Sequence, residues 1–235
     1  MNQNIIINTM RSIRAFVTKN LFPKKGYFLF PAKSLRPISA KFGFDRGTPV
    51  DRSYIEQFIR LHAAHIKGVC LEIHDNYYTK KFGGSHVTKS DVLDINADNT
   101  QANIYGDLRD IPDILNDTYD CVILTHTLGV IDNHEGAVQE LLRILKPGGV
   151  ILVTVSAMGV AQDPAHCFWR YTPAGLKYLF KKYLPDGNIE TTSYGNVLSG
   201  QAFWVGLAAE ELSAEELSYN DPRYAIVSAG VIQKK

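Results

Sequence analysis

Acidic side chains end or follow three short apolar runs in the first half of the chain. Glu72 lies near the end of the first run, Asp94 directly follows the second, and Asp107 follows the third. A carboxylate after the second run can accept hydrogen bonds from both hydroxyls of a ribose, and one after the third can accept from an adenine amino group. The order and spacing of these acids therefore predict a site for a ligand that contains ribose and adenine.

A second group of polar residues offers a different chemistry. His126 follows the fourth apolar run, and Asp163 and His166 lie in a polar and aromatic segment after the fifth. An imidazole titrates near neutral pH and is suited to take the proton of a reacting hydroxyl. These three residues are the candidate catalytic groups. The structural alternative is that each histidine only hydrogen-bonds the backbone of its own loop.

The apolar runs that carry these residues alternate with segments of helical periodicity. The predicted strands are residues 69–73, 86–93, 102–105, 121–124, 150–155, 189–194 and 224–232. Alternating strands and helices predict an α/β fold of the Rossmann-like, doubly wound type, with a mostly parallel seven-stranded sheet and helices on both faces. In such sheets ligands lie at the carboxyl ends of the strands, which is where the acids and His126 fall.

Two details of the predicted helices bear on the site. Thr48-Pro49-Val50-Asp51 predicts a helix start with Thr48 as the cap. The helix that follows is expected to carry Tyr54, Phe58, Leu61 and His65 on one face. Only about a dozen residues separate the first two strands, which is near the minimum for a parallel crossover, so the first crossover helix must be short or distorted.

Composition narrows the class of protein. The chain has 235 residues, of which 45% are hydrophobic and 21% charged, as expected for one α/β domain with an extension. The net charge of +1 gives no global field toward nucleic acid. The cysteines Cys70, Cys121 and Cys167 form no CxxC pair. With no signal-peptide pattern either, the sequence predicts a cytoplasmic protein without a metal site.

Residues 1–50 are expected to form an N-terminal extension, and residues 51–235 the main domain. Apolar residues at roughly helical spacing alternate with Arg11, Arg14 and Lys19, which predicts a basic amphipathic helix. Such a helix is typical of docking on its own domain or on a second subunit, which would make a homodimer. The alternative is a peripheral contact with a membrane surface.

The sequence resembles the class I S-adenosylmethionine (SAM)-dependent methyltransferases over about residues 50–232. The likeness rests on Glu72-Ile73, Asp94, Gly106-Asp107, Tyr119-Asp120 and, most specifically, Leu145-Lys146-Pro147-Gly148-Gly149 before a β-branched strand. The resemblance implies SAM as the cofactor. The residues that it places against SAM are Glu72, Ile73, His74, Asp75, Asn76, Asp94, Ile95, Gly106, Asp107, Leu108, Thr125 and His126.

A narrower resemblance is to methyltransferase domains that accompany glycosyltransferases in bacterial polysaccharide pathways. It rests on the segments 42–49, 78–84, 169–172 and 194–198. It implies O-methylation of a sugar or related small hydroxyl acceptor, with a glycosyltransferase as a partner protein. Trp169, Arg170 and Tyr171 would then contact the acceptor, although the two aromatic residues are equally suited to packing their loop.

One residue departs from the class pattern. The class usually has a glycine directly after the acid pair of the first strand, and this chain has His74. A Cβ atom and an imidazole there would crowd the cofactor or move the loop. His74 therefore favours an alternative function, a non-catalytic module of the same fold that binds a pathway partner and binds SAM weakly or not at all. A nicotinamide dehydrogenase fits poorly, because the Gly-x-Gly-x-x-Gly fingerprint is missing after the first strand.

Overall fold

The computed structural model describes residues 34–161 and 163–235, and Pro37–Lys235 form one compact unit. The predicted basic amphipathic helix falls within residues 1–33 and lies outside the described residues. The division of the chain at residue 50 stays a prediction. Within the described residues, every helix is too short or too polar to cross a membrane.

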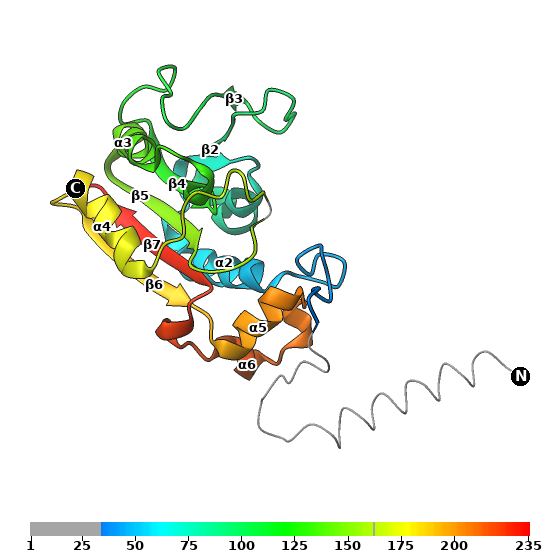
Figure 1. The fold of residues 1–235 in the computed structure, drawn as a ribbon. Helices are drawn as coiled ribbons and strands as arrows, with labels where there is room; N and C mark the ends of the chain where they lie inside the picture. Colours follow the sequence, from blue (N-terminus) through cyan, green and yellow to red (C-terminus); the bar gives the residue numbers. More distant parts are fainter. Residues whose placement is uncertain (1–33, 162) are drawn as a thin grey trace, which may run out of the picture. The chain divides into compact units, whose positions relative to one another are not determined.

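Seven strands form a single sheet in the order β3-β2-β1-β4-β5-β7-β6 (Figure 1). Their bounds are β1 Gly68–Ile73, β2 Val87–Asp94, β3 Ile104–Tyr105, β4 Tyr119–Thr125, β5 Leu145–Ser156, β6 Asn188–Tyr194 and β7 Val227–Gln233. The first five strands pair in parallel, and β7 runs antiparallel to both β5 and β6. The predicted fold class is confirmed. The strand order reverses between β1 and β4, the place where such sheets bind ligands.

Helices cover both faces of the sheet (Figure 1). They are α2 Val50–Leu61, α3 His134–Ile144, α4 Pro173–Tyr183, α5 Val197–Val205 and the short α6 Ala214–Ser218. Because successive side chains of a strand point to opposite faces, β4 contributes to two cores. Val122 and Leu124 pack in the core with α3 and α4, whereas Cys121 and Ile123 pack in the core with α2 and α5.

The start of α2 differs from the sequence prediction. Pro49 occupies the cap position and makes no side-chain capping bond. Thr48 lies one residue before the cap, and its N–H and hydroxyl both donate to the Glu210 carboxylate, at 2.9 and 2.7 Å. The helix ends at Leu61, which is 67% exposed, so His65, expected on the same helix face, lies in a separate 3₁₀ turn.

The elements near the C-terminus also shift. α5 begins at Val197 rather than Ala202, because the Asn196 side chain accepts from the Ser199 N–H and caps the helix. It ends before Gly206, which has a φ of +73°. The last strand starts at Val227, since Pro222–Tyr224 form a 3₁₀ turn.

The crossover from β1 to β2 confirms the expectation of a distorted helix. It consists of a π-helical turn, Thr79–Gly83, followed by a 3₁₀ turn, Gly84–His86. The carboxylate of Glu72, at the end of β1, receives the backbone N–H groups of Tyr78 and Thr79 at 3.0 and 2.8 Å. Glu72, the penultimate residue of β1, therefore fixes the start of the turn that follows the strand.

Candidate functional site

Three cavities surround the carboxyl end of β4. The β2 cavity, of about 470 Å³, has walls that include Leu93, Asp94, Asp107 and Phe168. The β1 cavity, of about 490 Å³, has walls that include Glu72, His74, Asp75 and Tyr77. The α2 cavity, of about 400 Å³, has walls that include Asp51, Arg52, Asp163 and Arg170. Residues 125–127, at the end of β4 and just after it, contribute to all three, so the cavities meet at this segment.

Asp94 lies on the wall of the β2 cavity, at the end of β2. Its Oδ1 accepts the Asn96 N–H at 2.9 Å, and its Oδ2 accepts the Asn99 amide at 2.6 Å. Burial alone would raise the pKa of Asp94, but the hydrogen bonds from Asn96, Asn99 and His74 outweigh it and lower the pKa. Asp94 is therefore ionised at neutral pH, the state in which a ribose would meet it.

His74 takes the left-handed conformation, with a φ of +75°, that a glycine would adopt without cost. Its Nδ1 lies 2.9 Å from Asp94 Oδ2, while its ring is largely exposed. The Asn99 amide that reaches Asp94 also donates to the His74 carbonyl at 2.6 Å. The imidazole thus lies against the acid predicted to hold the ribose, and it takes up acceptor capacity that a ribose would use.

Asp107, the acid after β3, is ion-paired with a residue that sequence reasoning missed. Arg109 donates its backbone N–H and its guanidinium to the Asp107 carboxylate, and this pairing lowers the pKa of Asp107. The same guanidinium reaches Asp132 Oδ1, after β4, at 2.7 Å. Arg109 therefore links two sides of the β2 cavity. An arginine two residues after the acid was the signal available in the sequence.

Glu72 is buried between β1 and the crossover turn and lines the β1 cavity. Besides the two backbone N–H groups, it accepts the Thr79 hydroxyl at 2.7 Å. Burial raises the pKa of Glu72, against these hydrogen bonds. Most of its acceptor capacity serves the chain itself.

His126 lies where the cavities join. Its backbone has a φ of +53°, and its N–H donates to Thr154 O at 2.7 Å. The side chain lines both the β2 and the α2 cavity, with Nδ1 3.8 Å from Asp51 Oδ2. Nε2 is buried and has no hydrogen-bond partner among the described residues.

Burial and the charges around the imidazole set its protonation. Burial lowers the pKa of His126, and the guanidinium groups of Arg52 and Arg170 lower it further against the attraction of Asp51. The imidazole is therefore neutral at neutral pH. The nearby Asp51 carboxylate favours a proton on Nδ1, which leaves the lone pair on Nε2.

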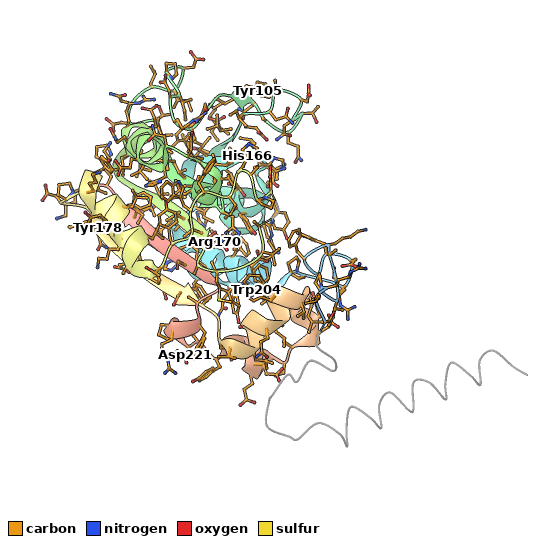
Figure 2. The ribbon with its side chains drawn as sticks, in the orientation of Figure 1. Tyr105, His166, Arg170, Tyr178, Trp204 and Asp221 are labelled. Atoms are coloured by element: carbon orange, nitrogen blue, oxygen red, sulfur yellow. The ribbon has the colours of Figure 1, made fainter. Side chains whose placement is uncertain are left out.

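The other two candidate bases form a pair of their own on the surface. Asp163 Oδ2 lies 2.6 Å from His166 Nδ1, and both side chains are exposed. His166 lines the β2 cavity and Asp163 the α2 cavity. Figure 2 shows His166 and Arg170 on the long segment between β5 and α4, with Arg170 on the side of α2. This segment forms an outer wall of the site.

The structure separates the three predicted acceptor contacts. Arg170 lines the α2 cavity, but Trp169 and Tyr171 line none of the three cavities. Trp169 donates its indole N–H to Ile131 O at 2.9 Å and packs edge-on against His134 at 4.2 Å. Tyr171 is buried beside the same His134 ring. Their contacts anchor the segment to the start of α3.

Most of the remaining residues placed against SAM lie on cavity walls. The β2 cavity includes Ile73, Ile95, Gly106 and Leu108, and the β1 cavity includes Ile73, Asp75 and Thr125. Asn76 contributes to none of the three cavities and donates its amide to Ser90 Oγ at 3.3 Å. Sequence reasoning also missed the aromatic residues Phe42, Phe44 and Phe203 of the α2 cavity.

Solved structures share this fold at low sequence identity. A SAM-dependent methyltransferase from Archaeoglobus fulgidus is 18% identical, and the match covers 84% of this chain and 100% of that chain with a TM-score of 0.53. One from Mesorhizobium loti is 9% identical, covers 82% of this chain and 100% of that chain, and has a TM-score of 0.54. The [4+2]-cyclase SpnF is 12% identical, with coverage of 80% and 83% and a TM-score of 0.53.

Comparison with protein families assigns the chain more directly. No curated protein matches the sequence. A family profile described as a methyltransferase domain matches residues 25–183, which is more than half of the chain. The chain therefore belongs to the methyltransferase domain family, and this membership implies the use of SAM.

Proposed function

We propose that this protein transfers the methyl group of SAM to a hydroxyl of a sugar or related small acceptor in glycan biosynthesis. Two features of the site support SAM as the cofactor. The β2 cavity has the size of a small-ligand site, and two ionised carboxylates, Asp94 and Asp107, stand on its wall. SAM would extend from there into the β1 cavity, and the acceptor would lie in the α2 cavity.

The proposal rests on His126 as the proton acceptor. Bound SAM supplies a methyl group activated by its sulfonium. The protein positions the acceptor, limits access of water and accepts the hydroxyl proton at His126 Nε2. This nitrogen has no hydrogen-bond partner among the described residues, its imidazole is neutral, and its side chain borders both the β2 and the α2 cavity. Nε2 itself is buried, so the proposal requires the imidazole to turn toward the α2 cavity when the acceptor binds.

Single-turnover methylation of a sugar panel tests the role of His126. His126→Asn should lower turnover by roughly 10²–10⁴-fold, because the proton acceptor is removed, while the affinity for SAM stays nearly unchanged. Only neutral imidazole accepts a proton, so the wild-type rate should be lost as the pH falls through the pKa of His126. Since that pKa is lowered, the loss should be centred below about 6.5.

Two further histidine variants serve as comparisons. His86→Asn, at an exposed position outside the three cavities, should leave rate and pH profile unchanged. His166→Asn distinguishes the second candidate base. If it alone abolishes turnover while His126→Asn retains the wild-type pH profile, the base is His166 and the assignment to His126 is wrong.

A non-catalytic module that binds a glycosyltransferase or another pathway protein remains the second candidate function. The observation in its favour is that the carboxylate of Asp94 already has hydrogen-bond partners within the chain, namely Asn96, Asn99 and His74. Calorimetry with SAM and its demethylated product, S-adenosylhomocysteine, decides between the two. Absence of binding of either compound by the full chain would support the module.

A further inference from the structure

Two arginines from distant parts of the sequence line the α2 cavity. Arg52 belongs to the first turn of α2. Arg170 belongs to the segment between β5 and α4, where Figure 2 labels it. The Arg52 guanidinium donates to the Tyr78 hydroxyl at 2.9 Å, and that of Arg170 to the Gly159 carbonyl at 3.2 Å. Within the described residues, neither guanidinium forms an ion pair with a carboxylate.

The carboxylates of the same cavity are already engaged. Asp163 accepts from the Ala165 N–H at 3.0 Å and pairs with His166. Asp51 accepts the backbone N–H of Arg52 at 2.8 Å and faces His126. The two guanidinium groups therefore retain donors for a ligand, Arg170 in the α2 cavity and Arg52 where the α2 and β1 cavities adjoin, while the acids of the α2 cavity hold partners from the chain.

A guanidinium is suited to this task, because its planar donors match the oxygens of a carboxylate or a phosphate. The aromatic residues Phe42, Phe44 and Phe203 supply the apolar part of the same cavity. A site that combines free guanidinium donors with aromatic walls discriminates between charged and neutral acceptors of one shape.

We infer that the α2 cavity binds an acceptor that carries an anionic group, a carboxylate or a phosphate, through Arg52 and Arg170. The inference rests on the proposed function, in which this cavity holds the acceptor. It narrows the substrate class from sugars in general to acidic or phosphorylated sugars.

Calorimetry on the full chain saturated with S-adenosylhomocysteine tests the inference, with glucose, glucuronate and glucose 1-phosphate as probes. Wild type should bind at least one of the two anions about 10-fold or more tightly than glucose, as expected for charge-assisted bonds. Glucuronate and glucose 1-phosphate distinguish a carboxylate from a phosphate. Arg170→Gln and Arg52→Gln should each remove most of this preference.

Control variants separate charge from folding. Arg60→Gln lies on α2 outside the α2 cavity and should keep the full preference. Arg52→Lys keeps the positive charge next to Tyr78 and should retain part of it. Equal wild-type binding of glucose and the anions, or anion binding that survives both Gln substitutions, overturns the inference.

Methyl transfer to the same probes distinguishes this inference from the proposed function. If an anion binds in an arginine-dependent way but is not methylated, the anion site is supported and the proposed function is contradicted. If glucose is methylated as efficiently as the anions, the proposed function is supported and the anion site is contradicted.

Discussion

At the scale of single residues, the contact between His74 and Asp94 bears on how tightly the ribose of the cofactor can bind. Sequence reasoning expected His74 to crowd the cofactor or to move its loop. In the structure the backbone keeps a conformation suited to glycine, and the ring lies on Asp94 instead. The imidazole therefore competes with a ribose for one carboxylate oxygen of Asp94. The effect on cofactor binding comes from this hydrogen bond rather than from steric crowding.

Substitution of His74 tests this competition. His74→Gly should tighten the binding of S-adenosylhomocysteine by about 2- to 10-fold, because one hydrogen bond to Asp94 no longer has to be exchanged. Calorimetry measures the change. His74→Ala removes the ring but keeps the Cβ atom, and a similar gain would assign the effect to the imidazole.

Asp94→Asn is the reference for these variants. It keeps the shape of the side chain and loses its charge, so binding should weaken by about 10-fold or more. Weaker binding in His74→Gly would contradict the competition and would make the imidazole a ligand contact.

At the scale of elements, the segment before α2 depends on the end of α5. Ile38 and Ser39 both donate their N–H groups to the Val205 carbonyl, at 2.8 and 3.1 Å. A Cβ atom on Gly206 would overlap the Ser39 carbonyl oxygen. This close approach holds the segment that carries Phe42 and Phe44 into the α2 cavity.

Gly206→Ala should therefore destabilise the protein and disturb the acceptor side of the site. The left-handed conformation alone costs about 1–2 kcal/mol for an L-residue, and the displaced Ser39 backbone adds to it. Urea unfolding measures the free energy. Gly148→Ala is the matched control, because Gly148 has a φ of +78° and open space around a Cβ atom. Equal costs for both variants would show that the contact with Ser39 is unimportant.

At the scale of the whole molecule, the nucleoside side of the site exists only when the sheet has formed. Asp94 ends β2, Asp107 follows β3 and His126 follows β4, and these strands become neighbours of β1 or of one another through parallel pairing. A ligand of these residues consequently binds the folded state and not the unfolded chain.

Such a ligand must raise the stability of the fold. S-adenosylhomocysteine at about 100 times its dissociation constant should increase the free energy of unfolding by about 2.7 kcal/mol. For a domain of this size the melting temperature should rise by about 5–10 °C. Differential scanning calorimetry measures the shift, with NADH as the control ligand. An unchanged melting temperature at millimolar S-adenosylhomocysteine would contradict SAM binding and support the module.

The central part of the fold could be predicted from the sequence. β4 is a continuous apolar run because both of its faces are buried, and this pattern is local and readable. Parallel strands end at one edge of a sheet, so the positions of Asp94, Asp107 and His126 at that edge followed from the strand order. The predicted bounds of the elements near the C-terminus were less accurate. The bounds of α5 depended on a cap at Asn196 and a left-handed Gly206, which hydrophobic periodicity does not report.

The partners of the site residues were decided only by the tertiary structure. His74 bonds to Asp94, Arg109 joins Asp107 to Asp132, and Trp169 packs on His134 rather than on a cavity. Each of these contacts depends on the path of a loop and on the directions of two side chains, neither of which is encoded in residue type or local periodicity. The sequence by itself determined which residues reach the end of the sheet, because strand pairing follows from apolar patterning. Hydrogen bonds between distant segments decided which of these residues remain available to a ligand. Buried polar and charged groups form hydrogen bonds in the folded protein, and only the tertiary structure determines which groups lie close enough to be their partners.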